Sequence, residues 1–418
     1  MISSNFFSQL GEASKTFREG TDRIVSPEET LARVRPHLPK LGITRIANVT
    51  GLDHIGIPVV MVCRPNSRAL SVSQGKGATV AAAKASGVME SIETYHAERV
   101  RLPLRLGSYE EMRANARVVD VSRLNRPRES VFHPDLPLLW TEGYDLLQRE
   151  PVFVPYEMVH ANFTPPQPAG SGCFSLTSNG LASGNHILEA VSHGICELVE
   201  RDSMTLWSLA GADAQRPTRL ELETVDDPMC LEVLGRLHEA RMPVAVWDMT
   251  SDVGIPAFVC VFADPSEASF GRITDYIGYG CHPMRHIALL RALTEAAQMR
   301  LTIIAGSRDD LDAVHYRPIA PDDPPAQGRR IDWQDTSGPR RDFRTIAHRN
   351  ETSFEGEVAW QLERLRAAGI ERVVAVNLTL PEFEIPVVRM IIPGLEMAFM
   401  DLKYFALGAR ARKAREKR

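Results

Sequence analysis

Three stretches of the chain place polar side chains at positions i, i+4 and i+7. The trios are Ser86, Glu90 and Glu93; His193, Glu197 and Glu200; and Arg291, Glu295 and Gln298. At 3.6 residues per turn, the members of each trio lie on one face of a helix. This feature constrains the fold more than any other, because it predicts three helices that each carry one polar stripe.

The residues before each stripe repeat as well. Each predicted helix follows a glycine-rich stretch, at residues 75–77, 180–184 and 278–280. Gly77 precedes Ser86 by nine residues, and Gly184 precedes His193 by the same spacing. We therefore expect three copies of one unit, in which a glycine turn leads into a helix. The copies come together so that their polar stripes converge.

A single Glu-x-x-Glu pair is common on a solvated helix face, because Glu is a good helix former. Here the surroundings are apolar: residues 80–85 are rich in Ala, and Ile195, Leu198 and Val199 surround the second pair. Four or five carboxylates facing one site would repel one another strongly unless metal ions neutralised them. Glu and Gln oxygens favour a hard ion, so the pattern predicts Mg²⁺ rather than Zn²⁺.

Carboxylate-held Mg²⁺ beside glycine turns and basic side chains indicates a polyphosphate ligand. Backbone N–H groups of a glycine-rich turn can face phosphate oxygens, and a helix N-terminus favours anions. Lys76, Arg201 and Arg291 would offset the charge that develops during phosphoryl transfer. The sequence has neither a Gly-x-x-x-x-Gly-Lys-Ser/Thr loop nor a Gly-x-Gly-x-x-Gly motif opening a helix after a strand. The predicted nucleotide site is therefore neither a P-loop nor a Rossmann site.

The rest of the chain alternates apolar β-rich runs with helical patterns, which predicts an α+β fold with mixed sheets. Strands are expected at 59–62, 244–247, 257–262, 373–378 and 387–392. Helices are expected at 27–38, 78–98, 186–209, 225–240 and 287–304. With 418 residues, the chain forms one large elaborated domain or two intimately joined ones.

Two segments predict loops, at 165–170 and 319–339, and the second is long enough to be mobile or functional. The segment 409–418 holds six basic residues and one acidic residue. It is interpreted either as a frayed, solvated helix end or as a contact for an acidic partner or peptide.

Composition excludes several protein classes. No run of about 18 apolar residues predicts a membrane span, and no apolar stretch followed by a cleavage site marks secretion. The six cysteines contain no Cys-x-x-Cys pair, so a reducing cytoplasm is expected. With 48 basic and 53 acidic residues, the net charge of −5 argues against general nucleic-acid binding.

Taken together, the motifs resemble those of YcaO-domain proteins. The matching pieces are Ser73-Gln74-Gly75-Lys76-Gly77-Ala78-Thr79, the Ser86–Glu90–Glu93 trio, Ser178-Asn179-Gly180-Leu181-Ala182-Ser183-Gly184-Asn185, Glu189 and His193, Glu197-Leu198-Val199-Glu200-Arg201-Asp202, and Arg291-Ala292-Leu293-Thr294-Glu295. They span about residues 15 to 398, so the resemblance implies a single YcaO domain that occupies nearly all of residues 1–418. It also implies a YcaO-like fold in which the three Glu-bearing helices surround a nucleotide site.

The resemblance implies an ATP- and Mg²⁺-dependent enzyme that activates a peptide backbone amide. The residues assigned to ATP are Lys15, Lys76, Ser86, Asn185, Arg201 and Arg291. Those assigned to the metal are Glu90, Glu93, Glu189, Glu197 and Glu200. His193, Glu295 and Gln298 are expected to support these groups, although His193 stands where some relatives carry Gln and could itself be a ligand. Lys15 corresponds to the family's N-terminal lysine, but its spacing to the following motif differs.

No protein nucleophile is assigned, and Cys196 and Cys281 are expected to be small core thiols. Azoline-forming members end in a Pro-x-Pro-x-Pro tail, which this chain lacks. The segments Thr44–Asp53 and Pro393–Glu396 resemble members that pair with a TfuA-like protein and form thioamides. A partner-delivered sulfide, a peptide or protein substrate and a homodimer are therefore expected. The alternatives are an azoline-forming cyclodehydratase, an accessory factor for ribosomal-protein methylthiolation, and a catalytically silent nucleotide-binding scaffold.

Overall fold

The computed structural model describes residues 13–265, 275–311, 337–397 and 404–416. Most of the expected loop at 319–339 therefore lies outside the described residues. Within the described part of the chain, no helix is both long enough and apolar enough to cross a membrane.

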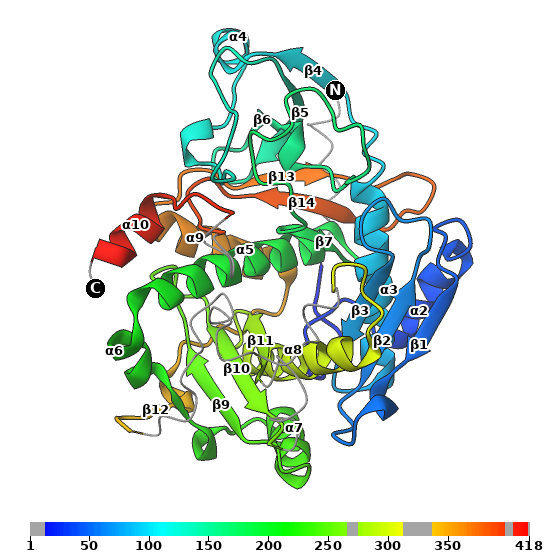
Figure 1. Ribbon diagram of the computed structural model, residues 1–418, viewed down its shortest axis with the longest axis vertical. Coiled ribbons are helices and arrows are strands. Elements are labelled where there is room, and N and C mark those ends of the chain that lie inside the picture. Colours follow the sequence, from blue (N-terminus) through cyan, green and yellow to red (C-terminus); the bar gives the residue numbers. More distant parts are fainter. Residues whose placement is uncertain (1–12, 266–274, 312–336, 398–403, 417–418) are drawn as a thin grey trace, which may run out of the picture.

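The described residues form one six-stranded antiparallel sheet and three smaller sheets (Figure 1). The large sheet contains β4 (Leu104–Gly107), β5 (Leu138–Asp145), β6 (Glu150–Pro155), β13 (Val374–Asn377), β14 (Val387–Ile391) and β7 (Leu181–Ser183). Its order is β4-β5-β13-β14-β7, and β6 also pairs with β5. The smaller sheets are β1-β2-β3 (Arg45–Asn48, Val59–Cys63, Val72–Lys76), β11-β10-β9 (Asp275–Cys281, Ala257–Ala263, Val244–Asp248) and β12-β8 (Arg341–Asp342, Leu220–Glu221).

The described helices pack around and between these sheets. They are α2 (Pro27–Val34), α3 (Val80–Ala97), α4 (Tyr109–Asn115), α5 (Ile187–Ala210), α6 (Ala212–Gln215), α7 (Pro228–Glu239), α8 (Arg285–Ala305), α9 (Phe354–Ala367) and α10 (Ala409–Glu416). The five predicted helices and five predicted strands are all confirmed, and the mixed α+β class with them. The first helix ends earlier than expected, at Val34, because Pro36 cannot donate the next helical hydrogen bond.

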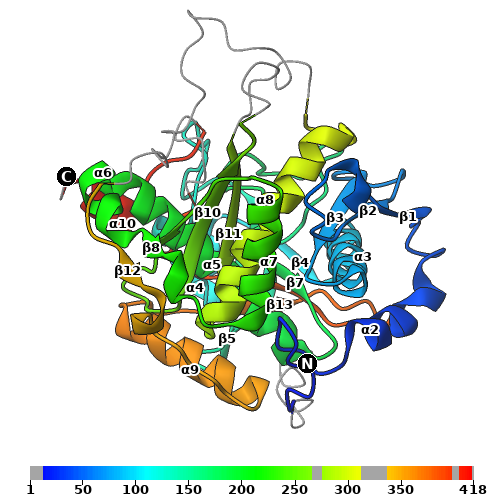
Figure 2. The same ribbon diagram turned by 90° about the horizontal axis from the view of Figure 1, so that it is seen from below.

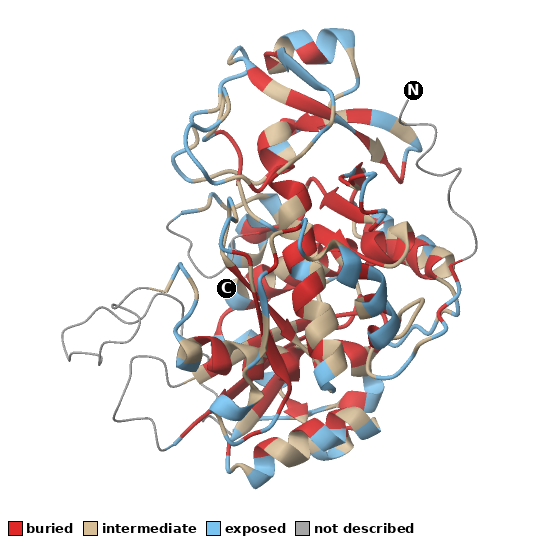
Figure 3. Ribbon diagram, turned by 90° about the vertical axis from the view of Figure 1, so that its right-hand side faces the viewer, coloured by how far each residue is buried: buried red, intermediate tan, exposed pale blue. Residues whose placement is uncertain are grey.

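Helix α5 occupies the centre of the molecule (Figure 1). On one side it contacts β7 and β14 of the large sheet, and on the other it contacts β11 of the sheet below. In the view from below, α8 lies on the sheet of β10 and β11, and α3 lies on the sheet of β2 and β3 (Figure 2). Figure 3 shows buried residues concentrated in the interior, between the helices and the sheets.

The glycine stretches form the predicted turn only in part. Gly180 lies in a turn with a φ of 79°, as expected. Gly75 instead lies in β3, where it pairs with Val60, and Gly278 and Gly280 lie in β11. A Cβ at Gly75 would come within 2.0 Å of the Ala83 carbonyl oxygen. These three strand glycines therefore let the following helix pack backbone against backbone, a close approach that a side chain would prevent.

The basic segment near the C-terminus is not the frayed helix end that one interpretation of the sequence expected. It forms α10, which packs against α5, and Ala411 is fully buried. The carboxylate of Glu396 accepts hydrogen bonds from the backbone N–H groups of Gly408 (2.8 Å) and Ala411 (2.9 Å). This carboxylate satisfies donors that a helix N-terminus leaves unpaired, which explains why the segment stays helical.

The glycine packing predicts opposite effects for two Gly→Ala substitutions. In Gly278→Ala the new Cβ would lie 2.2 Å from the Ala292 carbonyl oxygen, so the backbone must move. We expect the free energy of unfolding to fall by about 2–3 kcal/mol, as for an overpacked core. A Cβ added at Gly235, in α7, would meet nothing within 4 Å, so Gly235→Ala should raise the free energy of unfolding by up to about 1 kcal/mol through helix propensity. Urea denaturation measures both, and equal effects would contradict the packing role.

Candidate active site

A cavity of about 1930 Å³ is lined by α3, α5 and α8. All nine stripe residues line it, namely Ser86, Glu90, Glu93, His193, Glu197, Glu200, Arg291, Glu295 and Gln298. The predicted convergence of the three stripes is therefore confirmed. The cavity exceeds the roughly 300–1,000 Å³ of ordinary small-molecule pockets, so it has room for two ligands side by side.

The carboxylates of the cavity are held in an environment that disfavours their charge. Burial raises the pKa of Glu90 and of Glu200 to about 7 and that of Glu93 to about 8, and it also raises the pKa of Glu197. Their mutual repulsion acts in the same direction, since the charge of Glu197 further raises the pKa of the other three. Glu90, Glu93 and Glu200 consequently exchange protons near neutral pH, which suits a site that binds a cation.

Backbone donors from the second glycine stretch orient two of these carboxylates. The Ser183 backbone N–H and hydroxyl donate to Glu93 Oε1 at 2.8 and 2.7 Å. The Gly180 N–H donates to Glu197 Oε2 at 3.0 Å. We expected such N–H groups to face phosphate oxygens. In this stretch they instead fix the carboxylates that could hold the metal.

Arg389 of β14 supports the same stretch and was missed by the sequence analysis. Its Nη1 donates to the Asn179 carbonyl at 2.9 Å, and its Nη2 donates to the Thr177 carbonyl. The side chain is buried, and burial lowers its pKa to about 10. It therefore remains charged at neutral pH and its field reaches Glu197. No motif marks this residue, because it lies within an otherwise apolar strand.

Two cations predicted to meet the nucleotide are paired with carboxylates of the cavity. Arg201 Nη1 lies 3.2 Å from Glu200 Oε1, and its Nη2 lies 3.7 Å from Glu197 Oε1. Burial opposes the charge of Arg201, but these carboxylates outweigh burial and raise its pKa. Lys76 forms an ion pair with Glu295, whose pKa is lowered because Lys76 and Arg201 outweigh the effect of burial.

The remaining charged residues connect the stripes to other segments. Arg291 Nη1 donates to the Cys281 carbonyl at 3.0 Å. Glu189 Oε1 lies 3.5 Å from Arg23 Nε, and its Oε2 accepts from the Ile24 N–H at 3.1 Å. Arg23 lines the cavity but was missed, since nothing in the sequence around it suggests that the N-terminal segment returns to α5.

The uncharged candidates also lie at the cavity. Asn185 Nδ2 donates to Thr30 Oγ1 at 3.0 Å, which ties the start of α5 to α2. Gln298 Nε2 donates to Gln74 Oε1 at 3.3 Å. Burial lowers the pKa of His193 well below its usual value, so the ring is neutral. Among the residues that the structure describes, its buried Nδ1 has no hydrogen-bond partner, so the ring is available to a ligand.

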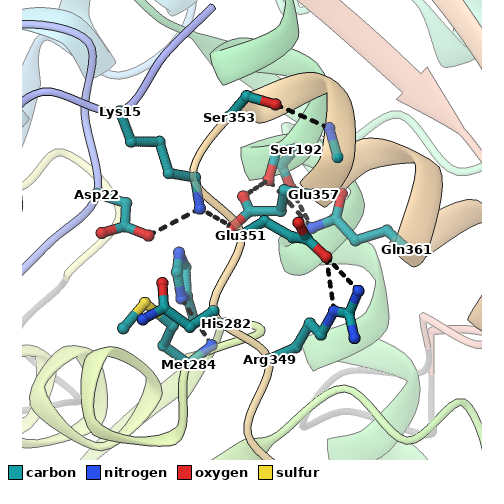
Figure 4. Close-up of polar contacts among 12 residues, drawn as sticks. Lys15, Asp22, Ser192, His282, Met284, Arg349, Glu351, Ser353, Glu357 and Gln361 are labelled. Carbon is teal, nitrogen blue, oxygen red and sulfur yellow. Dashed lines mark hydrogen bonds and ion pairs between the residues drawn. The ribbon is translucent and has the colours of Figure 1, made fainter.

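Lys15 is not among the residues that line the cavity. Figure 4 shows its contacts with Asp22 and Glu357. Its ammonium donates to Asp22 Oδ2 at 2.7 Å and to Glu357, and the side chains of all three are buried. Glu357 also accepts a hydrogen bond from the Ser192 hydroxyl of α5. The geometry gives no support to a direct contact between Lys15 and the nucleotide. Instead, Lys15 anchors the segment that carries Arg23 to the cavity wall.

Within the described ranges, one group has the compactness of a preformed metal site. Ligand atoms of Asp22, His282 and Glu357 lie within 4.8 Å of one another. The Lys15 ammonium forms ion pairs with both Asp22 and Glu357, so it already supplies the positive charge that a metal ion would bring. The described carboxylates of the cavity form no such compact trio. This suits Mg²⁺, which is usually held by one or two carboxylates together with phosphate oxygens and water.

Comparisons with known proteins agree with this geometry. The family model described as "YcaO cyclodehydratase, ATP- and Mg²⁺-binding" matches residues 74–396. A protein from Rhizobium leguminosarum bv. trifolii, described as lying in the tfuA 3′ region, is 39% identical over 398 residues. That alignment covers 93% of this chain and 92% of the relative.

Two solved structures share the fold. The YcaO protein of Methanopyrus kandleri, bound with AMPPCP and Mg²⁺, is 25% identical with a TM-score of 0.71, and the match covers 93% of this chain and 96% of that one. A heterocyclase in complex with substrate and cofactor has a TM-score of 0.73 at 21% identity, which supports the fold alone. That match covers 93% of this chain but only 54% of the heterocyclase.

The raised pKa values predict that metal binding depends on pH. The folded state holds the protons of Glu90, Glu93 and Glu200 more tightly than the unfolded state does. Their contribution to stability is therefore present below about pH 4.5 and is lost as the pH rises through 7 to 8. Mg²⁺ requires the ionised forms, so its affinity with AMPPCP should increase from pH 6 to 8.5, by about tenfold per pH unit for each proton displaced.

Titration calorimetry in two buffers of different ionisation enthalpy measures this proton release directly. Glu93→Gln removes one titrating carboxyl, so the dependence on pH should become shallower. Glu232→Gln, on the exposed face of α7, should leave it unchanged. An affinity that is flat between pH 6 and 8.5 would show that these carboxylates do not bind the metal.

Proposed function

Because the chain belongs to the YcaO cyclodehydratase family, which binds ATP and Mg²⁺, we propose that it activates a backbone amide of a peptide or protein by transferring the γ-phosphoryl group of ATP to the amide oxygen. A sulfide that a partner protein delivers adds to the amide carbon and becomes the sulfur of a thioamide. The family and its cofactors are the premise, and the substrate and product are the proposal.

The observation that carries the proposal is the convergence of carboxylates from α3 and α5 in one large cavity. Glu90, Glu93, Glu197 and Glu200 all line it, and Arg201 and Arg291 line it beside them. Oxygen donors of this kind suit Mg²⁺, and the arginines suit phosphates. The volume supports a nucleotide together with a segment of extended peptide.

These side chains would share the work of phosphoryl transfer. The carboxylates of α3 and α5 would hold Mg²⁺, which, when bound, offsets the negative charge of the phosphates. Hydrogen bonds from Ser183 and Gly180 keep Glu93 and Glu197 in place before any ligand arrives. Arg201 and Arg291 would stabilise the charge that spreads over the phosphoryl oxygens. Positioning and electrostatics account for the catalysis, because such a transfer needs no covalent attachment to the protein.

The reaction balances without a protein nucleophile. Hydrosulfide adds to the amide carbon, the resulting oxyanion attacks the γ-phosphorus, and ADP leaves. Collapse of the tetrahedral intermediate breaks its C–O bond, forms C=S and releases phosphate, which carries the former amide oxygen and takes up the thiol proton. Burial raises the pKa of the Cys281 thiol well above its usual value, and neither Cys196 nor Cys281 lines the cavity, so neither is suited to carry the sulfur.

One comparison favours a thioamide over an azoline. The Rhizobium relative is described by its position in the tfuA 3′ region, which supports a TfuA-like protein as the partner that supplies sulfide.

The proposal is tested by comparing the peptides and proteins of the host with and without this gene. The deletion strain is complemented with the wild-type chain, with Glu197→Gln or with Glu232→Gln. We expect a peptide or protein that shows sulfur-for-oxygen exchange by mass spectrometry in the wild-type and Glu232→Gln strains. We expect complete loss of that product with Glu197→Gln, because the metal site would lose a ligand.

The same spectra separate the alternatives. Loss of water would identify an azoline, and a methylthio group on a ribosomal protein would identify an accessory role. No gene-dependent mass change would support the silent scaffold. A Glu197→Gln strain that still makes the thioamide would contradict the assigned site.

A further inference from the structure

We propose that the exposed basic face of α10 is a docking surface for an acidic segment of the peptide substrate. The face consists of Arg412, Lys413 and Arg415. This inference rests on the proposed function, because it takes the occupant of the cavity to be a peptide. It adds the chemical class of the substrate and the route by which it leaves the cavity.

The first observation is that α10 is fixed in place. The Arg410 guanidinium donates to both carboxylate oxygens of Asp202, at 3.0 and 2.8 Å, and also pairs with Asp252. Asp202 is fully buried and directly follows Arg201 of the active site. Breaking a buried, hydrogen-bonded pair of this kind is costly, so α10 is tied firmly to α5.

The second observation is that the other cations of α10 lack such partners. Arg412, Lys413 and Arg415 are exposed, and in the part of the chain that the structure describes none of them forms an ion pair. Glu416 is the one acidic residue of the helix. The helix is held rigidly and presents positive charge that no described acidic side chain neutralises. Its charge is therefore complementary to that of an acidic partner.

The third observation is the position of this face at one end of the cavity. Helix α5 lines the cavity from Glu189 to Leu209, and Arg415 of α10 also lines it. Figure 1 shows α10 beside the C-terminal half of α5. A peptide that follows α5 away from the acidic stripe would therefore reach α10.

The geometry of α5 sets the spacing. From Glu200 to Ser208 the helix rises about 12 Å at 1.5 Å per residue. The cavity wall between them contains Met204, Thr205 and Trp207, and none of the α5 residues that line the cavity after Arg201 is charged. About four residues of extended peptide cover that distance at about 3.3 Å each. The proposal therefore predicts acidic residues about four or more positions from the amide that reacts.

The test is direct binding of a labelled peptide to the full chain, measured by fluorescence anisotropy. The probe is fluorescein-labelled (Glu-Gly)5, and the neutral control is fluorescein-labelled (Gln-Gly)5. We expect the wild type to prefer the acidic probe, with an affinity that falls as salt is added, because exposed charges are screened. The variant Arg412→Gln/Lys413→Gln/Arg415→Gln should bind the acidic probe about tenfold more weakly, as the loss of three exposed ion pairs would give.

A matched control removes the same charge elsewhere. Arg35→Gln/Lys40→Gln/Arg45→Gln neutralises three exposed cations that do not line the cavity, and it should bind the probe like the wild type. The proposal is overturned if the α10 variant binds the acidic probe as well as the wild type does. It is also overturned if the control variant loses as much affinity, or if the wild type does not distinguish the two probes.

AMPPCP binding in the presence of Mg²⁺ separates this result from the proposed function. The Arg412→Gln/Lys413→Gln variant should keep wild-type affinity for AMPPCP, because neither side chain lines the cavity. Absence of AMPPCP binding in the wild type would count against the proposed function. The probe experiment would still decide whether α10 recognises acidic peptide, since it requires no nucleotide.

Discussion

The active site is organised around the repulsion among carboxylates that α3, α5 and α8 bring into one cavity. Burial and proximity hold the pKa of Glu90, Glu93 and Glu200 near or above 7. Arg201 and Lys76 offset only part of that charge, through ion pairs with carboxylates of α5 and α8. The cavity is therefore suited to a divalent cation and to the phosphates that accompany it.

The convergence depends on backbone packing that glycine permits. Gly75, Gly278 and Gly280 lie in strands whose following helices come too close for any side chain. The sequence showed this repeat and its nine-residue spacing, and therefore predicted both the helices and the shared cavity. It misjudged the local structure, because glycine favours turns and close backbone contacts equally, and only the tertiary partner distinguishes the two.

Contacts between distant segments were beyond the reach of the sequence. Arg23 meets Glu189 in a segment that Lys15 anchors to Glu357 of α9, a contact that joins residues 342 positions apart. Arg410 likewise holds α10 against Asp202. Such residues have no periodicity and no motif, and their role depends on how separate elements pack. The acidic stripes were predictable because helical geometry alone places their members on one face.

The central claim is that residues on three separate helices form one nucleotide and metal site. It is tested most directly by calorimetric titration of AMPPCP, with and without Mg²⁺, into the wild type, Glu90→Gln (α3), Glu197→Gln (α5) and Arg291→Gln (α8). We expect Mg²⁺-dependent binding by the wild type and a loss of at least about tenfold in each variant, since each removes a charged contact to a buried ligand. Undiminished binding in the variant of any one helix would show that this helix does not belong to the site.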